Sequence, residues 1–287
     1  MRIIDGKATA AAIREELAGQ VAALAPAAGR KPGLAVILVG EDPASQTYVR
    51  NKQRACDEIG VASELLHLPP DTSQLRLLRC IDALNTREDV DGILLQLPLP
   101  RGLENLSCLE RIRPDKDVDG FHPDNMGRLV SGLPGLRPCT PAGVMELLKR
   151  HAFFLEGKRA VVLGRSNIVG KPLAIMLGAR TEYANATVTV CHSQSKNITE
   201  ICQSADFLFA AMGQPGFIRG DMVKPGAVVI DVGISVTEQG LRGDCDFASV
   251  SRTASAITPV PGGVGPMTIA MLLRNTLEAY TKHLGRI

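Results

Sequence analysis

The stretch Gly33-Leu-Ala-Val-Ile-Leu-Val-Gly-Glu-Asp-Pro-Ala-Ser-Gln-Thr-Tyr-Val-Arg-Asn-Lys52 joins an apolar run to an amphipathic one. The apolar run, rich in branched side chains and bounded by glycines, predicts a buried β-strand. Asp42 and Pro43 then supply an N-cap and a first-turn proline, and Gly60 is placed to end the helix. The sequence therefore predicts a strand–helix unit of an α/β fold.

Tyr48 and Lys52 are four residues apart on this helix, so they share one face near the carboxyl end of the strand. Open α/β sheets bind ligands at that end. A phenol and an amine held together there can exchange a proton. Spacing alone favours the alternative, a surface helix whose tyrosine packs on the lysine stem.

The composition bounds the classes of partner. The chain has 287 residues, 45% of them hydrophobic and 22% charged, which suits a globular protein of two domains. A net charge of +2 predicts neither a nucleic-acid partner nor a membrane partner. Aromatic residues make up 3% and tryptophan is absent, so base-stacking platforms are not expected.

The seven cysteines are scattered and form no Cys-x-x-Cys pair. They indicate reduced core residues rather than disulfides, and we expect no metal site. The charged segment Met1–Lys7 lacks the apolar core of a signal peptide, and no run of transmembrane length follows it. We therefore expect a cytoplasmic protein.

The rest of the first half continues the α/β pattern. A helix over residues 7–24 should end in the proline-containing segment 25–32, and a strand at 61–68, a helix at 73–85 and a strand at 92–96 should follow. This order predicts a parallel sheet covered by helices.

Polar residues near the last of these strands are candidates for a site. Gln96 ends the strand, either as an amide facing the same cleft as Lys52 or as an edge-exposed glutamine. The loop Pro114–Pro123 contains Asp117 and Asp119, which could accept hydrogen bonds from an N–H-rich ligand; on its own it reads as a solvated turn.

Between the two halves, the segment 124–140 is rich in glycine and proline and is interpreted as a linker. A helix over Pro141–Arg150 with Thr140 as its N-cap should follow it.

The second half opens with a strand at 158–163, the turn Gly164-Arg-Ser-Asn-Ile-Val-Gly-Lys-Pro172 and a helix at 173–178. A glycine-containing turn between a strand and a helix N-terminus predicts a dinucleotide site. The spacing is Gly-x-Ser-x-x-x-Gly rather than Gly-x-Gly-x-x-Gly, so the motif is incomplete evidence by itself.

The next predicted strand, 186–191, favours NADP over NAD. An NAD site usually has a carboxylate after this strand, and none is present. Arg165 and Ser193, with Ser195 as a further candidate, instead offer donors for a 2′-phosphate, whereas His192 fits ordinary loop polarity.

Three further short strands at 205–211, 227–232 and 256–258 complete a Rossmann-type sheet, in which Asp231 has no evident partner. The closing helix, 267–283, should return to the first domain. We therefore predict an α/β protein with two domains. Residues 1–122 plus 268–287 form one of them, and residues 138–267 form the Rossmann-type NADP-binding one.

Seven motifs in order resemble the bifunctional methylenetetrahydrofolate dehydrogenase/methenyltetrahydrofolate cyclohydrolases. They are Tyr48-Val-Arg-Asn-Lys52, Gly92-Ile-Leu-Leu-Gln-Leu-Pro-Leu-Pro100, Lys116-Asp-Val-Asp-Gly-Phe-His-Pro123, Gly164-Arg-Ser-Asn-Ile-Val-Gly-Lys-Pro172, Val190-Cys-His-Ser193, Lys224-Pro-Gly-Ala-Val-Val-Ile-Asp-Val-Gly233 and Thr258-Pro-Val-Pro-Gly-Gly-Val-Gly-Pro-Met-Thr268. The resemblance runs through nearly the whole chain. It implies that the domain of residues 1–122 plus 268–287 is the folate-binding or catalytic one.

The resemblance implies a role for each candidate. Lys52 would be the catalytic lysine with Gln96 beside it, Tyr48 would stack on and orient the folate, and Asp119 would hold the pterin ring. The other residues that it places near the substrate are Pro261 and Gly262, and those that it places near NADP are Gly164, Arg165, Ser166, Gly170, Ser193 and Ile234.

The same resemblance implies oxidation of 5,10-methylenetetrahydrofolate and hydrolysis of the methenyl product. It also implies a homodimer and a place in one-carbon metabolism and purine biosynthesis. Two residues depart from the family: Ser235 stands where asparagine is common, near the nicotinamide end, and Arg54 where lysine is common. The rival classes are an NADP-dependent dehydrogenase of another small substrate and an inactive folate-binding protein.

Overall fold

The structure, a computed structural model, describes residues 1–238 and 240–285. Internal packing divides the chain into two compact units. Unit 1 comprises Met1–Ala11 and Thr140–Met271, and unit 2 comprises Ala12–Cys139 together with the residues from Leu272 onward. Within the described ranges, no helix combines the length and apolarity needed to cross a membrane.

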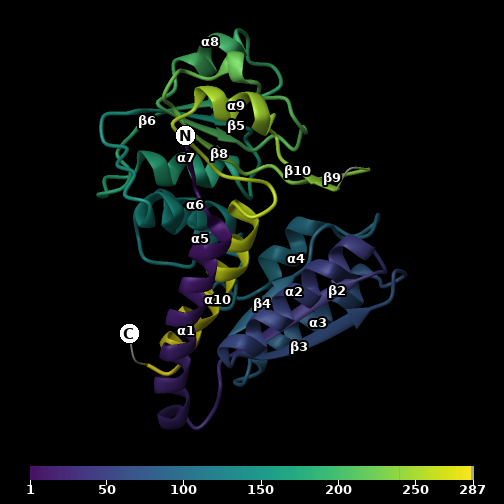
Figure 1. Cartoon of the computed structure of the whole chain (residues 1–287). Helices are drawn as coiled ribbons and strands as arrows, with labels where there is room; N and C mark the ends of the chain where they lie inside the picture. Colours follow the sequence, from purple (N-terminus) through teal and green to yellow (C-terminus); the bar gives the residue numbers. More distant parts are fainter. Residues whose placement is uncertain (239, 286–287) are drawn as a thin grey trace. The chain divides into compact units, whose positions relative to one another are not determined.

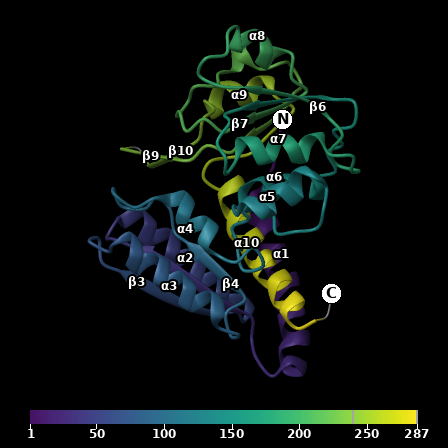
Figure 2. The same ribbon diagram turned by 180° about the vertical axis from the view of Figure 1, so that it is seen from behind.

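Unit 2 contains a three-stranded parallel sheet in the order β3-β2-β4. Helices α2 and α3 lie along its strands in both Figure 1 and Figure 2. The elements are β2 (Gly33–Val39), α2 (Pro43–Ile59), β3 (Ala62–Leu68), α3 (Gln74–Thr86), β4 (Gly92–Leu95), α4 (Asn105–Arg111) and α5 (Pro123–Val130), with the parts of α1 (Gly6–Ala28) and α10 (Val264–His283) that belong to this unit.

Strand β2 is central because every one of its residues is buried. Ala35, Ile37 and Val39 belong to an apolar cluster that also contains Leu77 and Ile81 of α3. Alternate residues of a strand point to opposite faces, and the right-handed crossovers of this strand order place α2 on the other face. A continuous apolar run therefore forms a strand covered on both sides, as predicted.

Unit 1 contains a six-stranded sheet in the order β1-β11-β8-β7-β5-β6, in which every neighbouring pair is parallel. If β5, β6, β7, β8 and β11 are numbered 1 to 5, their order across the sheet is 2-1-3-4-5. This is the order of a doubly wound sheet, and it reverses between β5 and β7. The elements are β1 (Arg2–Ile3), α6 (Cys139–Arg150), β5 (Arg159–Leu163), α7 (Gly170–Gly178), β6 (Thr187–Cys191), α8 (Ile198–Gln203), β7 (Phe207–Ala210), η1 (Gly220–Met222), β8 (Val228–Asp231), β9 (Ser235–Thr237), β10 (Gly240–Arg242), α9 (Phe247–Thr253) and β11 (Ala256–Ile257), with the remaining parts of α1 and α10.

Helix α1 ends within segment 25–32, as predicted, although it continues through Pro26 to Ala28. The proline stands near its last turn among alanines, which favour helix. Two sequence predictions about helices are wrong. Segment 124–140 contains α5, where Pro123 starts a helix instead of breaking one. Helix α6 already begins at Cys139, so Thr140 is not its N-cap; the Thr140 hydroxyl hydrogen-bonds that of Thr268 (3.0 Å).

The two units have boundaries that differ from those of the predicted domains at the start of the chain and near residue 139. Strand β1 pairs with β11, so residues 1–11 belong to unit 1 instead of the first predicted domain. Residues 123–137, left between the predicted domains, and residues 138–139, assigned to the second predicted domain, pack within unit 2. A two-residue strand such as β1 has too little pattern to be predicted.

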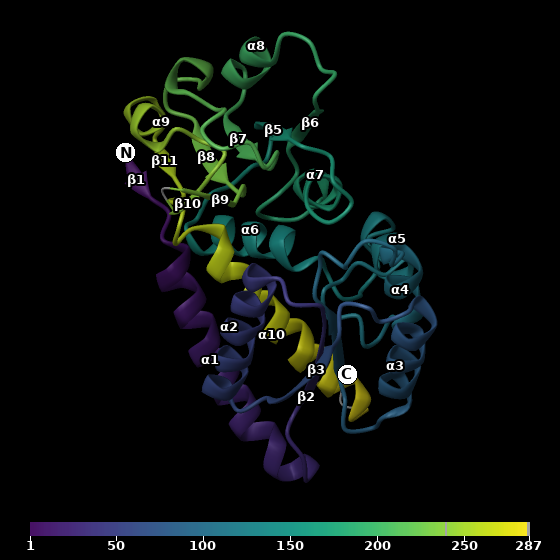
Figure 3. The same cartoon turned by 90° about the vertical axis from the view of Figure 1, so that its right-hand side faces the viewer.

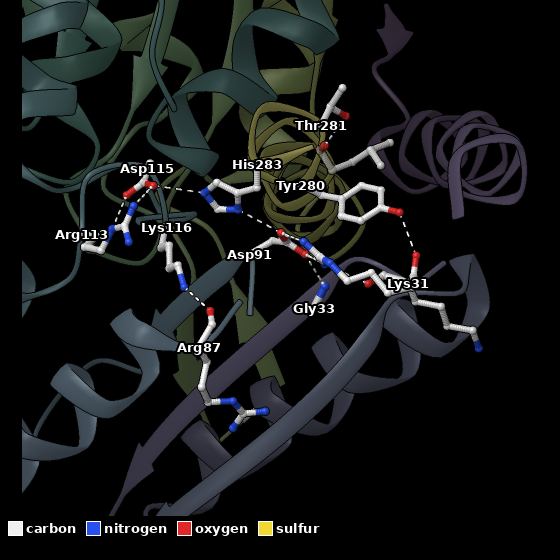
Figure 4. Close-up of polar contacts among 12 residues, drawn as sticks. Lys31, Gly33, Arg87, Asp91, Arg113, Asp115, Lys116, Tyr280, Thr281 and His283 are labelled. Atoms are coloured by element: carbon white, nitrogen blue, oxygen red, sulfur yellow. Dashed lines mark hydrogen bonds and ion pairs between the residues drawn. The ribbon is translucent and has the colours of Figure 1, made fainter. Parts of the chain in front are cut away.

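A buried ion-pair cluster holds the end of α10 within unit 2 (Figure 4). Asp91, whose side chain is fully buried, accepts two hydrogen bonds from Arg30 (2.6 and 2.8 Å) and one from the Gly33 N–H (2.8 Å). The ring nitrogens of His283 lie 2.9 Å from Asp91 and 3.1 Å from Asp115, and only the doubly protonated ring donates to both. Burial alone would raise the pKa of Asp91, but hydrogen bonds from Arg30, His283 and Gly33 hold it below its usual value.

We expect Asp91→Asn to destabilise the protein by about 3 kcal/mol at pH 7, because it leaves Arg30 and His283 without their buried anion. A lowered carboxyl pKa stabilises the fold above the unfolded-state pKa and loses that effect as pH falls toward the folded value. The gap between wild type and variant should therefore shrink below about pH 4. Urea denaturation at several pH values measures it.

Asp82→Asn, which removes an exposed partner of Arg111, is the matched control and should change stability little. A loss in Asp91→Asn no greater than in this control would contradict a structural role for the cluster.

Candidate functional site

Helix α2 is fixed at both ends, which sets the positions of Tyr48 and Lys52. The Ser45 N–H donates to the N-cap Asp42 (2.7 Å), and this bond lowers the pKa of the Asp42 carboxyl. Gly60 adopts the left-handed conformation (φ 81°) that ends the helix. Both caps were predicted from the sequence and are confirmed.

Lys52 and Gln96 meet in unit 2. The Lys52 Nζ donates to the Gln96 Oε1 (3.1 Å), and the Gln96 Nε2 donates to the Leu97 carbonyl (2.6 Å). The second bond fixes the amide with its oxygen toward the lysine. Because α2 follows β2 and Gln96 follows the neighbouring β4, the two side chains meet at the carboxyl edge of the sheet.

Asp119 lies in the segment that extends this sheet edge, since Ile93 of β4 forms a parallel bridge with Asp117. Desolvation raises the pKa of the Asp119 carboxyl to about 6; the charge of Lys52 opposes the rise and that of Asp117 adds to it. The electrostatic effect of Lys52 indicates that its amine lies near the Asp119 carboxyl. Tyr48, one turn before Lys52, is 42% exposed.

The two acids of the loop differ in their partners. Asp117 is buried and accepts hydrogen bonds from the His122 N–H (2.8 Å) and the Asn125 Nδ2 (2.9 Å). Within the described residues, the Asp119 carboxylate has no hydrogen-bond partner. One acid therefore holds the loop, and the other is available to a ligand.

Unit 1 contains a cavity of about 460 Å³ at the carboxyl ends of β5, β6 and β7. This is the point where the strand order reverses, the usual ligand position in doubly wound sheets. The cavity is lined by Leu163, Gly164, Arg165, Ser166, Cys191, His192, Ser193, Ile198, Ala211, Met212, Gln214 and Phe217.

The cavity lining fits an anionic dinucleotide such as NADP. It contains no acidic residue. The Arg165 side chain is exposed, with no hydrogen-bond or ion-pair partner in the described part of the chain, and Ser193 is exposed beside it in the lining. Ser195, the further candidate, uses its hydroxyl to accept from the His192 N–H (3.0 Å).

Of the six predicted cofactor residues, Gly164, Arg165, Ser166 and Ser193 line the cavity, whereas Gly170 and Ile234 do not. Ser166 accepts from the Val169 and Gly170 N–H groups (3.1 and 3.4 Å), so its hydroxyl caps the start of α7.

Packing within the protein requires glycine at two positions of the turn, Gly164 and Gly170. A Cβ on Gly164 would lie 2.1 Å from the Ala211 carbonyl oxygen, and one on Gly170 would lie 2.1 Å from the Gly164 carbonyl oxygen. Gly164 also has a φ of +115°, which other residues rarely adopt. Their small size therefore permits close backbone packing.

Pro261, Gly262 and Ile234 belong to unit 1, whereas Lys52 belongs to unit 2. The Gly262 carbonyl accepts from the Lys7 N–H (2.8 Å), and Ile234 is 37% exposed. Their predicted contacts with substrate and cofactor remain predictions. In the residues that the structure describes, no group of three or more His, Cys, Asp or Glu side chains is arranged to hold a metal ion.

Sequence reasoning did not find the partner of Asp231, nor any role for Asp244. Asp231 accepts from the backbone N–H groups of Asp244 and Cys245, both at 2.9 Å. Desolvation raises the pKa of its carboxyl to about 6, although these hydrogen bonds oppose the rise. No local sequence signal indicates these contacts, because a carboxylate that binds distant backbone N–H groups leaves no complementary side chain to recognise.

Comparison with known proteins covers the whole chain. Residues 4–119 match the family model for the tetrahydrofolate dehydrogenase/cyclohydrolase catalytic domain, and residues 138–284 match that for the NAD(P)-binding domain. The chain is 66% identical over 285 residues to the bifunctional protein FolD of Nitratidesulfovibrio vulgaris (strain DP4), which covers 99% of this chain and 100% of that protein.

Solved structures agree. The bifunctional dehydrogenase/cyclohydrolase from Campylobacter jejuni has a TM-score of 0.94 and 49% identity over 100% of both chains. The enzyme from Trypanosoma brucei, solved with NADP and an inhibitor, has a TM-score of 0.92 and 41% identity over 98% of both chains.

Proposed function

This chain belongs to the tetrahydrofolate dehydrogenase/cyclohydrolase family, and we propose that Lys52, Gln96 and Tyr48 carry its proton transfer. The proposed reaction sequence is oxidation of 5,10-methylenetetrahydrofolate with NADP, then hydrolysis of 5,10-methenyltetrahydrofolate to 10-formyltetrahydrofolate. The observation that carries the assignment is the hydrogen bond from Lys52 to Gln96 (3.1 Å) beside the unpaired Asp119.

The oxidation needs orientation more than it needs a protein acid or base. The lone pairs of the folate nitrogens expel a hydride from the one-carbon bridge, and NADP in its oxidised form would supply the hydride acceptor when bound. The role of the protein is to hold the folate ring for this transfer. Tyr48 is assigned to stacking on the ring because its side chain is exposed beside Lys52, and Asp119 is assigned to accepting hydrogen bonds from the pterin N–H groups.

The hydrolysis does need proton transfer. Water attacks the cationic methenyl carbon, and its oxygen loses both protons. One proton goes to the folate nitrogen that keeps the electron pair of the C–N bond that opens, and the other is released. Lys52 is the titratable group placed to move these protons, and the fixed Gln96 oxygen holds its Nζ in position. The hydroxyl of Tyr48, one helical turn away, is assigned a supporting role.

In unit 1, Arg165 and Ser193 are assigned to the 2′-phosphate of NADP. The support for this is an acid-free cavity lining that contains an unpaired arginine. Gly164 and Ser166 line the same cavity and are assigned to the dinucleotide backbone, and Gly170 acts indirectly by starting α7. Ile234, Pro261 and Gly262 stay assigned to the nicotinamide and folate through the family resemblance.

The finer biological assignments are also proposals. A cytoplasmic location is proposed from the scattered cysteines and the charged segment Met1–Lys7, and a contribution to purine biosynthesis from the family resemblance. A homodimer is supported further by the β9–β10 ribbon, whose cross-strand pair Val236 and Leu241 is 76% and 43% exposed. An isolated two-stranded ribbon with an apolar pair is marginal in water. Light scattering of the purified protein tests the dimer.

We expect NADP to be preferred over NAD, and Arg165→Ala to narrow the preference by about 2–3 kcal/mol because a charge-assisted bond to phosphate is lost. The measurement is kcat/KM for both cofactors, following the methenylfolate absorbance with methylenetetrahydrofolate as substrate. Arg180→Ala, an exposed arginine outside the cavity lining, is the control. A wild-type preference for NAD would overturn the assignment.

We expect Asp119→Ala to weaken folate binding by about 1–3 kcal/mol and to leave NADP binding unchanged. Because the pKa of Asp119 is about 6, wild-type affinity for folate should fall as pH drops through that value and the acceptor becomes protonated. Separate titrations of folate and NADP across pH measure this, with the exposed Asp124→Ala as control. If Asp119→Ala weakened the binding of folate and NADP equally, Asp119 would have a structural role instead of a role in folate binding.

We expect Lys52→Gln to lower cyclohydrolase activity by at least about 10², since the variant keeps hydrogen bonding but loses the titrating amine. Dehydrogenase activity should survive in part, so methenylfolate should accumulate. Parallel assays of the two steps on the folded variant measure this, with the exposed Lys31→Gln as control. Hydrolysis that persists while hydride transfer is lost would show that Lys52 is not the proton-transfer group.

A further inference from the structure

The Asp244 carboxylate accepts hydrogen bonds from three successive backbone N–H groups. Its oxygens lie 2.6 Å from the Met212 nitrogen, 3.0 Å from the Gly213 nitrogen and 2.7 Å from the Gln214 nitrogen. Asp244 is fully buried. Three convergent N–H groups form a concavity that binds an anion, and here the anion is a side chain of the protein.

Asp244 is itself held by the carboxyl end of β8. Asp231, the last residue of β8, accepts from the Asp244 and Cys245 N–H groups (both 2.9 Å). It also accepts from the Gly233 N–H (3.2 Å). In Figure 3, β7 and β8 lie side by side, and the pairing of Ala210 with Asp231 places their carboxyl ends together. The two carboxylates therefore link β8 to the segment that follows β7.

The fit around both carboxylates leaves no room for larger residues. A Cβ on Gly243 would lie 2.0 Å from an Asp231 carboxylate oxygen, and one on Gly233 would lie 2.2 Å from the Asp244 carboxylate carbon. Each acid thus has a glycine packed against it. This packing and the three short bonds restrict the segment to one position.

The restrained segment is one wall of the dinucleotide cavity. Ala211, Met212 and Gln214 line the cavity, whereas Asp244 does not. We infer that Asp244 is a positioning residue for NADP, acting through the backbone of Met212–Gln214 and not through contact with the cofactor. This inference rests on the proposed assignment of the cavity in unit 1 to NADP.

The test uses Asp244→Asn in the full-length protein. An asparagine has one acceptor oxygen, so its amide nitrogen faces a backbone donor and the segment is released. We expect the Kd and KM for NADP to rise about tenfold or more, while kcat at saturating NADP stays within about threefold and the folate Kd is unchanged. Asp246→Asn is the matched control, because Asp246 is exposed and its side chain makes no capping bond.

A folded Asp244→Asn that binds NADP like the wild type would overturn the inference, as would an equal loss of folate binding. If this variant does not fold, Gly213→Ala strains the same segment, since Gly213 has a φ of +67° and nothing within 4 Å of an added Cβ. Unchanged NADP binding there would also overturn it. Arg165→Ala separates the two assignments: if it leaves NADP binding intact, the cavity assignment fails.

Discussion

In each of the two parallel sheets, an aspartate just before a strand exchanges two hydrogen bonds with one residue of the neighbouring strand at the amino edge. Asp91 precedes β4; its N–H donates to the Gly33 carbonyl and its carboxylate accepts from the Gly33 N–H, both at 2.8 Å. Asp206 precedes β7 and makes the same pair of bonds with Arg159, both at 2.9 Å. Each acid is also ion-paired with a basic side chain. Strand ends leave backbone groups outside the ladder, so a buried sheet edge requires such partners.

At the carboxyl edges, the two units differ in whether an aspartate is left without a hydrogen-bond partner. This difference determines the charge of each candidate site. In unit 1, Asp231 and Asp244 accept hydrogen bonds from backbone N–H groups and do not line the cavity. The lining therefore has no acid, and Arg165 supplies its charge. In unit 2, Asp117 accepts a hydrogen bond from the His122 N–H, whereas the Asp119 carboxylate has no hydrogen-bond partner among the described residues and lies near Lys52. An acid-free cavity suits a phosphate, whereas a free carboxylate suits a ring rich in N–H groups.

Sequence patterns predicted the longer strands to within about two residues, because a fully buried parallel strand needs a continuous apolar run. They missed the short helices α4, α5, α8 and α9, whose six to eight residues are too few for helical periodicity to show. The sequence left open whether Gln96 faces Lys52, and the structure places the two side chains together at one edge of the sheet. The Asp231–Asp244 contact could not be predicted, since a hairpin separates the two residues and a carboxylate that binds backbone leaves no complementary side chain to recognise.

The glycine motif shows why spacing alone was incomplete evidence for a dinucleotide site. Gly164 and Gly170 are small because each packs on backbone, at the Ala211 and Gly164 carbonyl oxygens respectively. Between them, Ser166 uses its hydroxyl to cap the first N–H groups of α7, which a glycine at that position would leave to a ligand. With those donors partly occupied, the helix N-terminus has less to offer a phosphate, and the proposed assignment gives more of the anion binding to Arg165. The N–H groups of residues 212–214 already donate to Asp244, so under that assignment this cavity wall contributes its shape and not its hydrogen bonds.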